Sequence, residues 1–442
     1  MTPRTTLVLP LLVAVGACSA PPAAQRGPSV ILVSIDTLRP DHLGCYGYDA
    51  PTSPQIDAFC DESVVFEHAN AQAPSTLPSH ASILTSLLPH HHGASWENKR
   101  GLPDEITTLA EVLAGRGYRT AAFTGGGQMD PVFGLAQGFE KYRVVATDDF
   151  GVTVRRGLEW LDSLGDESFF LFLHSYQVHH PYDPEPEVLD LFETDYDGPL
   201  SDTISVEAIR RINQADKKLP AADVQHIVNT YDAEIREVDS AFGRLLDSLR
   251  ERDLYDPIML VFTSDHGEEL GEHGFVGWHS HTLFEELLRV PLMIRFPAGA
   301  EAGRRVERLV RSIDIAPTVL RAIGSRAPEE FSGIDLAALW SSRQVPPMVS
   351  VSRLDRADGA RVSAIRDQRF KLIRLFSRRQ RLFDLDHDPG ENWDTSTSFP
   401  HEVGRLLASY ESLLESRPTP AKTVVNPNDE LRRELEALGY IQ

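Results

Sequence analysis

The sequence predicts an α/β fold with a large central sheet and a second, small antiparallel sheet near its C-terminal end. Two short apolar runs, residues 30–33 and 258–262, have the length and aliphatic character of buried strands. Residues 227–249 carry an apolar side chain at every third or fourth position, which is typical of a helix that covers a sheet. Residues 349–386 alternate apolar and polar side chains, as the strands of a small antiparallel sheet do.

An acidic turn follows each of the two apolar runs. Asp36 comes after the first run, and Asp265 with His266 comes after the second. Ligands of open α/β sheets bind beyond the carboxyl ends of the strands, so we expect these three side chains at one sheet edge. Two carboxylates and an imidazole can hold a divalent cation. A single aspartate after a strand is more often a turn or cap residue, and the two turns together favour a metal site.

Residues 73–82, between the two turns, form a hydroxyl-rich segment that leads into an apolar stretch with the pattern of a helix. The segment contains Thr76, flanked by Ser75 and Ser79. A cation bound to a hydroxyl oxygen stabilises the alkoxide and makes it a competent nucleophile near neutral pH. The sequence therefore predicts ester-cleaving chemistry at Thr76.

Ordered motifs along nearly the whole chain resemble the sulfatase family, within the alkaline-phosphatase superfamily. They begin with Asp36-Thr37-Leu38-Arg39-Pro40-Asp41 and continue at residues 44–47, 84–85, 89–93, 289–292, 314–318, 365–366, 371–373, 382–385, 388–391 and 438–440. The resemblance implies a large mixed, mostly parallel sheet flanked by helices, and a small C-terminal antiparallel sheet subdomain. It also implies a sulfatase-like ester hydrolase, acting on sulfuric or phosphoric esters.

The nucleophile position departs from the usual family pattern. Family members that oxidise their nucleophile to formylglycine carry Cys or Ser there, with Pro two residues later and Arg four residues later. Here the aligned residues are Thr76, Pro78 and His80. Threonine cannot become formylglycine, so a different mechanism is expected, and His80 is interpreted as a residue that caps or packs its helix.

Two cationic elements of the family are also missing. The Lys-x-His element is absent from residues 123–127, and Trp278-His279-Ser280-His281 stands where a lysine is expected before Thr282. The loss of sulfate-binding cations and the gain of imidazoles resemble the phosphodiesterase and phosphotransferase members with a threonine nucleophile. A sulfate, a phosphate and a phosphonate ester therefore all stay open as substrates, and so does transfer to an acceptor other than water.

The resemblance implies one divalent metal ion, with Ca, Mg, Mn and Zn all open. Its expected ligands are Asp36, Thr76, Asp265 and His266. Relatives with two metals carry an aspartate where this chain has Ser175, so a second site is expected to be incomplete.

Three further side chains are candidates for the chemistry around the nucleophile. The resemblance places His179 beside the leaving group, where an imidazole can donate a proton. It aligns Asn98 with a donor to the transferred group, and it puts His279 near the missing lysine. His281 is interpreted as part of a surface turn and His180 as a bystander.

The composition limits the partners. The 442 residues contain 43 Lys and Arg against 65 Asp and Glu, a formal charge of −22. So acidic a chain argues against nucleic acid or an anionic membrane face as partner. The expected partner is a small-molecule, glycan or lipid ester, and the oligomeric state is open. Cys45 and Cys60 could pair in an oxidising compartment, although two cysteines alone do not show that they do.

The N-terminal residues predict export. Residues 1–18 read as a lipoprotein signal peptide with a lipidated Cys18, and residues 19–28 as a flexible tether. The protein is therefore expected on the bacterial cell envelope, lipid-anchored and facing the periplasm. A plain secretory signal is the alternative.

The rest of the chain divides into a catalytic domain at residues 29–345, an α+β subdomain at 346–425 and a C-terminal helix or tail at 426–442. Residues 185–222 have weak periodicity and are expected to form an insertion over the site, where substrate choice is set. The alternative to an enzyme is a catalytically inactive lipoprotein of the same fold that binds a glycan or a lipid headgroup.

Overall fold

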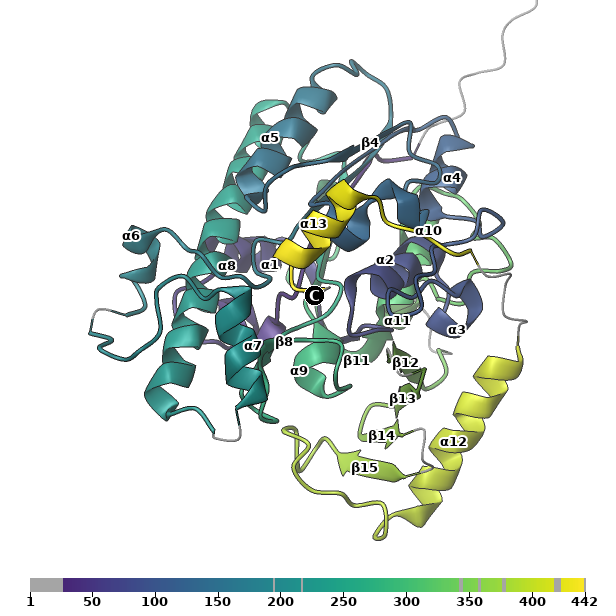
Figure 1. Ribbon diagram of the computed structural model, residues 1–442. Coiled ribbons are helices and arrows are strands. Elements are labelled where there is room, and N and C mark those ends of the chain that lie inside the picture. The colour runs from purple at the N-terminus through teal and green to yellow at the C-terminus, as the bar shows by residue number, and fades with distance from the viewer. Residues whose placement is uncertain are drawn as a thin grey trace, which may run out of the picture.

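The computed structural model describes residues 27–193, 195–215, 218–341, 345–356, 359–375, 379–416 and 423–440. Within these residues a nine-stranded sheet forms the centre of the molecule (Figure 1), in the order β11-β2-β10-β6-β1-β5-β3-β4 with β9 paired to β2. The strands are β1 (Val30–Ile35), β2 (Val64–Asn70), β3 (Arg119–Thr124), β4 (Lys141–Val144), β5 (Phe169–Ser175), β6 (Met259–Thr263), β9 (Arg289–Val290), β10 (Leu292–Arg295) and β11 (Arg305–Arg311).

Strand β1 lies in the middle of this sheet and is buried along its whole length. It runs parallel to β5 on one side and to β6 on the other. Only the pairings of β10 with β2 and β6, and of β2 with β9, are antiparallel in the described sheet. Because helices cover both faces, the strand residues are apolar on both sides, which explains the continuous apolar runs in the sequence. The predicted mixed, mostly parallel sheet is confirmed.

Helices cover the two faces and divide the interior into two cores. One core joins Ile31 and Val33 of β1 to α1 (Pro54–Asp61), α5 (Phe150–Leu161) and α8 (Ala221–Glu251). The other joins Val30 and Leu32 to helices on the opposite face, which are α2 (Thr76–Thr85), α4 (Leu109–Ala114) and α10 (Ile315–Ala322). Neighbouring residues of β1 thus enter opposite cores, as the two-residue repeat of a strand requires.

Helix α8 confirms the predicted covering helix. Its apolar stripe is buried throughout, and it consists of Ile227, Tyr231, Ile235, Val238, Phe242, Leu245 and Leu249. This stripe packs with α1 and α5 against the same face of the sheet. Burial of each such side chain contributes about 1.5–3 kcal/mol relative to exposure, so this one helix secures much of that face.

The small C-terminal sheet is also confirmed. It is antiparallel, in the order β12 (Ser350–Asp355), β13 (Arg361–Arg366), β14 (Phe370–Arg374) and β15 (Gln380–Asp384). Helix α12 (Pro400–Glu415) packs on it and shares its separate small core. In Figure 1 this unit lies at one side of the large sheet.

The chain then returns to the large domain. Helix α13 (Asp429–Ala437) packs against the short helix η3 (Gly127–Met129). Its Leu431 and Leu435 join the core above α2. Figure 1 shows α13, in yellow, over the middle of the molecule rather than beside α12, and the C-terminal end lies next to it.

The predicted insertion holds two short helices, α6 (Pro186–Leu189) and α7 (Val206–Gln214), and α7 packs on β8. The remaining elements are α3 (Pro89–His92), α9 (Glu285–Leu288), α11 (Ala338–Ser341), β7 (Glu269–Leu270), β8 (Val276–Trp278) and the short turns η1 (Pro40–His42), η2 (Gly44–Tyr46), η4 (Pro131–Phe133), η5 (Pro297–Gly299) and η6 (Ser312–Asp314).

Cys45 and Cys60 form a disulfide, which settles a pairing that the sequence left open. No helix within the described residues has the length and apolar character needed to cross a membrane. The predicted signal peptide, Cys18 and most of the tether lie outside the described residues. The division at residues 345 and 425 stays a prediction.

Candidate active site

The two acidic turns meet at one edge of the sheet, as predicted. Strands β1 and β6 are neighbours and parallel, so Asp36 and Asp265 leave the same sheet edge. His266 lies between them, with its Nε2 atom 3.4 Å from Asp265 Oδ2 and 3.8 Å from Asp36 Oδ1. All three side chains are fully buried.

One atom of each of these side chains lacks a hydrogen-bond partner among the described residues. The three buried atoms are Asp36 Oδ1, Asp265 Oδ2 and His266 Nε2. Buried polar atoms are normally paired, since an unpaired one costs about 1–3 kcal/mol. The three ligand atoms lie within 4.8 Å of one another, so the residues fit a divalent cation.

The charges around this cluster point the same way. Burial raises the pKa of Asp36 to about 6. Burial and the neighbouring Asp36 carboxylate raise the pKa of Asp265 as well. Burial lowers the pKa of His266, but the neighbouring Asp265 and Asp36 carboxylates more than offset this, so that the pKa of His266 is raised. Two buried carboxylates repel each other, and a bound cation would remove that cost.

Thr76 begins α2, directly after Ser75 as the N-cap residue. Its hydroxyl is buried and lies 3.2 Å from Asp36 Oδ2. The helix start is held from outside, because the Gln128 side chain accepts the Leu77 backbone N–H at 2.9 Å. The predicted nucleophile therefore lies against the predicted metal ligands.

Two buried imidazoles, those of His80 and His174, contact the residues of this cluster. His80 donates Nδ1–H to the Thr76 carbonyl at 2.9 Å, and its Nε2 accepts the Ser34 hydroxyl at 3.0 Å. His174, the penultimate residue of β5, lies 3.3 Å from Asp36 Oδ2. Burial lowers the pKa of His80 to about 3 and that of His174 to about 4, so both are neutral. The prediction that His80 packs its helix is correct, although it also lies 3.5 Å from Asp265.

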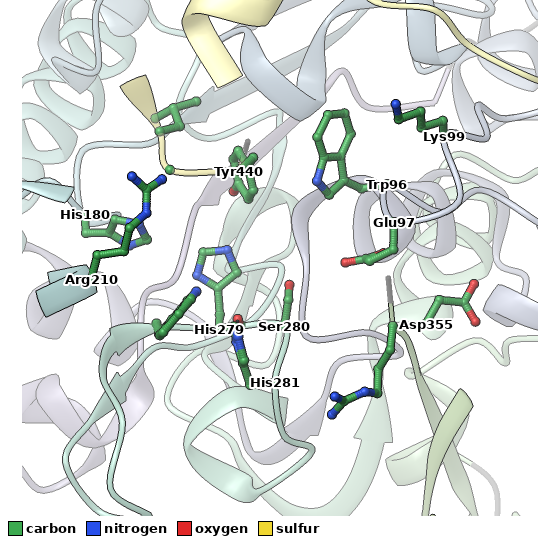
Figure 2. A pocket seen from close by; sticks show the side chains of 14 residues that line it. Trp96, Glu97, Lys99, His180, Arg210, His279, Ser280, His281, Asp355 and Tyr440 are labelled. Carbon is green, nitrogen blue, oxygen red and sulfur yellow. Dashed lines mark hydrogen bonds between the residues drawn. The ribbon is translucent and has the colours of Figure 1, made fainter. Parts of the chain in front are cut away.

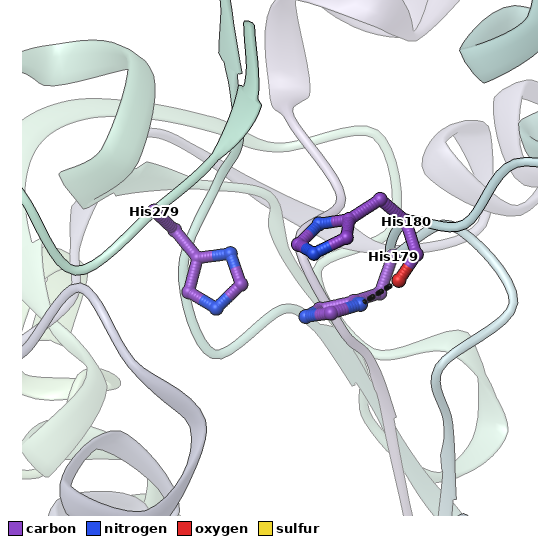
Figure 3. Close-up of side chains that lie close together, drawn as sticks. All are labelled: His179, His180 and His279. Carbon is purple, nitrogen blue, oxygen red and sulfur yellow. Dashed lines mark hydrogen bonds between the residues drawn. The ribbon is translucent and has the colours of Figure 1, made fainter. Parts of the chain in front are cut away.

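Three more imidazoles form a second cluster, which the Tyr440 hydroxyl links to Thr76. His179, His180 and His279 each offer a nitrogen within 4.8 Å of the others, and all are buried (Figure 3). His279 Nδ1 lies 3.1 Å from Glu268 Oε1, and His180 Nδ1 lies 3.5 Å from Glu268 Oε2. Burial is the main cause that lowers the pKa of His279 to about 4 and that of His179 well below its ordinary value. His180 is thus part of the cluster rather than a bystander.

This imidazole cluster could also hold a metal ion, since His180 Nδ1 lacks a hydrogen-bond partner among the described residues, but both nitrogens of His179 are engaged. His179 contacts the His180 carbonyl through Nδ1 and the Tyr440 hydroxyl through Nε2 at 3.0 Å. The Ser175 hydroxyl donates to the Asp148 carbonyl. These contacts favour Asp36, Asp265 and His266 as the cation site.

Two candidates lie farther out. The Asn98 amide donates to Ser95 Oγ at 3.0 Å and to Asp355 Oδ2 at 3.1 Å, so both of its hydrogens are engaged. Its role as a donor to the transferred group stays a prediction. His281, which was predicted in a surface turn, lines the cavity, and its Nδ1–H donates to the His279 carbonyl at 2.6 Å.

A cavity of about 570 Å³ opens over the cluster (Figure 2). Trp96 lies on one side, and His180 and Arg210 lie on the other, with His279 and Tyr440 between them. Arg210 comes from α7, so the insertion does reach the site. Lys99, Trp278 and Arg356 complete the aromatic and cationic part of the lining.

A family model described as Sulfatase matches residues 28–325 of this chain. The chain belongs to the sulfatase family. A second model, N-sulphoglucosamine sulphohydrolase, C-terminal, matches residues 271–402. The predicted sulfatase family within the alkaline-phosphatase superfamily is therefore confirmed, and the predicted class of sulfatase-like ester hydrolase agrees with it.

Individual relatives of this sulfatase-family chain are distant. Arylsulfatase K of Canis lupus familiaris is 26% identical over 451 residues, covering 88% of this chain and 82% of the relative. N-acetylglucosamine-6-O-sulfatase of Bacteroides thetaiotaomicron is 23% identical over 495 residues, covering 88% of this chain and 86% of the relative.

Solved structures share the sulfatase fold. BT4656 in complex with its substrate D-Glucosamine-2-N, 6-O-disulfate superposes with a TM-score of 0.75 at 20% identity, covering 89% of this chain and 99% of that one. Phosphonate Monoester Hydrolase of Agrobacterium radiobacter superposes with a TM-score of 0.72 at 20% identity, covering 88% of this chain and 95% of that one.

Two residues of the site, Glu268 and Tyr440, were not predicted from the sequence. Glu268, which links His180 to His279, is three residues after Asp265 and carried no separate pattern. Tyr440 reaches Thr76 from the far end of the chain. The motif at residues 438–440 could have pointed to Tyr440, because it resembles the family, but the resemblance assigned no role to this residue.

Proposed function

We propose that this protein cleaves a sulfate, phosphate or phosphonate ester, with the Thr76 hydroxyl as nucleophile beside one divalent cation. The observation that carries the proposal is that Thr76 Oγ1 lies 3.2 Å from Asp36 Oδ2. The other oxygen of this carboxylate, Oδ1, is one of the three buried atoms without a hydrogen-bond partner among the described residues. Asp36, Asp265 and His266 would hold the cation, and Thr76 would complete its shell. A cation there would supply charge stabilisation for an ionised hydroxyl and for the oxygens of the transferred group.

The chain's own residues supply the rest of the chemistry. The start of α2 fixes Thr76 against the carboxylates, and the buried neutral His80 and His174 hold that arrangement rigid. His279 lines the cavity, and the His179 ring packs against it at a centroid distance of 4.8 Å. We assign His179 to the leaving group and His279 to the ester group. The covalent adduct on Thr76 is then released to water or to an acceptor.

The cavity supports a sugar or lipid-headgroup ester as substrate. Trp96 and Trp278 offer flat apolar faces, while Lys99 and Arg210 offer positive charge. Aromatic faces with a few polar groups are typical of carbohydrate-sized sites, and the cations suit a second anionic group. The sugar sulfate bound by BT4656 and the phosphonate ester named for the Agrobacterium enzyme are the two chemistries to compare.

A substrate panel tests this proposal. Nitrophenyl sulfate, a bis-nitrophenyl phosphate diester and a nitrophenyl phosphonate monoester should be compared in the presence of Ca²⁺, Mg²⁺, Mn²⁺ or Zn²⁺. We expect turnover of at least one ester class that disappears on chelation and returns with one cation. If the protein binds its cation yet turns over no ester in the panel, the proposal that it is an enzyme is contradicted. That result would favour the alternative, a catalytically inactive lipoprotein that binds a glycan or a lipid headgroup.

His179 should matter most for poor leaving groups. An alkyl alcohol needs a proton as it departs, whereas nitrophenolate leaves as a stable anion. We expect His179→Ala to slow an alkyl ester about 10²–10⁴-fold, and a matched nitrophenyl ester far less, because general-acid catalysis contributes about that much. Turnover of both esters should be measured in parallel. Equal losses on both would remove the leaving-group role and point to His174 or His279.

We also propose that the protein is anchored to the cell envelope through a lipid on Cys18, facing the periplasm. The small residues before Cys18, after an apolar run, support this proposal. Cys18→Ala is expected to move the protein from the membrane fraction to the soluble periplasmic fraction, which immunoblotting of fractionated cells would measure. An unaltered distribution of the variant would rule out Cys18 as the anchor.

A further inference from the structure

The loop between α3 and α4 presents to the cavity a carboxylate that the proposed reaction does not use. Glu97 lines the cavity beside Trp96. Figure 2 shows the Glu97 carboxylate turned into the cavity, toward His279. The Trp96 ring lies 6.2 Å from the ring of Tyr440, whose hydroxyl is 3.0 Å from Thr76 Oγ1. Glu97 therefore faces the space that the alcohol part of an ester at Thr76 would occupy.

Hydrogen bonds hold this loop in a tight turn. Ser95 and Arg100 exchange two backbone hydrogen bonds of 2.9 Å at the base of the turn. At its tip, the Asn98 amide donates at 3.1 Å to Asp355 Oδ2, which belongs to β12 of the small C-terminal sheet. Because the turn is held at its base and at its tip, Glu97 has a fixed place in the cavity wall.

A second carboxylate in this wall already has a cationic partner, whereas Glu97 does not. Arg353 donates to both oxygens of Asp355, at 2.7 and 2.9 Å, and Figure 2 shows the Asp355 carboxylate turned away from the centre of the cavity. Among the described residues, no ion pair involves Glu97. The cavity is lined by three cationic side chains that form no ion pair with Glu97, which are Lys99, Arg210 and Arg356.

The surroundings of Glu97 favour a positively charged ligand. Burial, together with the nearby Asp355, raises the pKa of Glu97 to about 7, although the Glu97 backbone N–H and the Ser95 hydroxyl donate to the carboxylate. A neutral donor offsets the lost hydration of a carboxylate only in part, whereas a cation also adds electrostatic attraction. The rings of Trp96 and Trp278 line the same cavity, and aromatic faces attract ammonium groups.

We infer that Glu97 and Trp96 form a subsite for an ammonium group on the alcohol part of the substrate. This inference rests on the proposed function, because Glu97 contacts the reacting molecule only when its ester lies at Thr76. The ammonium N–H groups donate to the Glu97 carboxylate, and the carbon atoms beside the nitrogen pack on the Trp96 ring. Glu97 exchanges no proton with the substrate, so it determines which alcohol is bound and leaves the chemical step to other residues.

Three aryl esters test the subsite, in whichever ester class the substrate panel finds reactive. They carry an aminomethyl, a hydroxymethyl or an acetamidomethyl group at the same ring position, so only the first is charged. We expect wild-type kcat/KM to be at least about tenfold higher for the aminomethyl ester than for the hydroxymethyl ester, because one partner of the hydrogen bond is then ionised. The difference should lie in KM, with kcat for the three esters within about threefold.

Glu97→Gln keeps the size of the side chain and removes its charge. In this variant kcat/KM for the aminomethyl ester should fall about tenfold, and that for the hydroxymethyl ester should change by less than about threefold. The preference is a ratio within one preparation, so it does not depend on the fraction of folded protein. Glu97→Asp, which keeps the charge, should retain part of the preference. Glu105→Gln, on an exposed residue that follows the turn, is the matched control and should keep all of it.

Three results would overturn the subsite and leave the proposed function standing. They are equal wild-type kcat/KM for the three esters, a wild-type preference for the hydroxymethyl ester, and a preference that survives in Glu97→Gln. A wild-type protein that turns over no ester of the panel would instead overturn the proposed function, and the inference with it.

Discussion

Replacing Thr76 by alanine is expected to lower kcat/KM for the reactive ester by at least about 10³-fold, because the variant has no nucleophile at this position. The fold should survive. Thr76 contributes one hydroxyl contact to Asp36 and one to Tyr440, and loss of such hydrogen bonds costs about 1 kcal/mol each. Steady-state kinetics with a melting curve on the same preparation would separate the two effects.

Thr76→Ser is the matched control, since it keeps the hydroxyl and removes only a methyl group. We expect this variant to retain activity within about tenfold of wild type. Mass spectrometry of the quenched wild-type enzyme should locate the covalent group on Thr76. Activity of the alanine variant within about tenfold of wild type would transfer the role to Ser75 or Ser79. Ser79 is the weaker of these two, because its hydroxyl already donates to the Asp265 carbonyl at 2.7 Å.

The second large effect concerns the cation. Asp265→Asn should remove most of the bound metal, and turnover with it, because the amide keeps the shape and loses the charge of one ligand. Elemental analysis should find one ion per wild-type chain and much less in the variant. An unchanged metal content would exclude Asp265 as a ligand.

Stability gives an independent measurement. A cation at 100 times its dissociation constant stabilises the native state by about 2.7 kcal/mol, so the wild type should melt at a higher temperature when the cation is added. The variant should show little such shift. After chelation the variant should melt at the same temperature as the wild type or at a higher one. The reason is that Asp265→Asn also removes the repulsion between two buried carboxylates. Asp190→Asn, on the exposed C-cap residue of α6, should behave as wild type throughout.

Much of the fold and part of the site could be predicted from sequence, for identifiable reasons. The strands before Asp36 and Asp265 are buried on both faces, so they appear as continuous apolar runs, and the carboxyl ends of neighbouring parallel strands must coincide. The stripe of α8 follows from the same burial at helical spacing. Local pattern and one geometric rule were therefore enough to place both carboxylates.

The parts that could not be predicted depend on contacts between distant segments. Whether His180 is a bystander depends on where Glu268 lies, and nothing local to residue 180 specifies that. Tyr440 reaches Thr76 only because α13 packs on η3 and the turn after the helix brings residue 440 to the site. The Asn98 amide is held by Asp355 of the small subdomain, a contact that no alignment of residue 98 alone could supply. Each of these depends on tertiary packing rather than on spacing.

The position of β1 also bears on how fast the molecule folds. This strand is near the start of the chain, yet its neighbours in the sheet are residues 170–175 on one side and 259–263 on the other. Pairings between such distant segments require large loops to close first, which makes folding slow. The cation ligands are far apart until β6 joins β1, so a cation can bind only after that slow step. Its presence should therefore retard unfolding while leaving the refolding rate nearly unchanged.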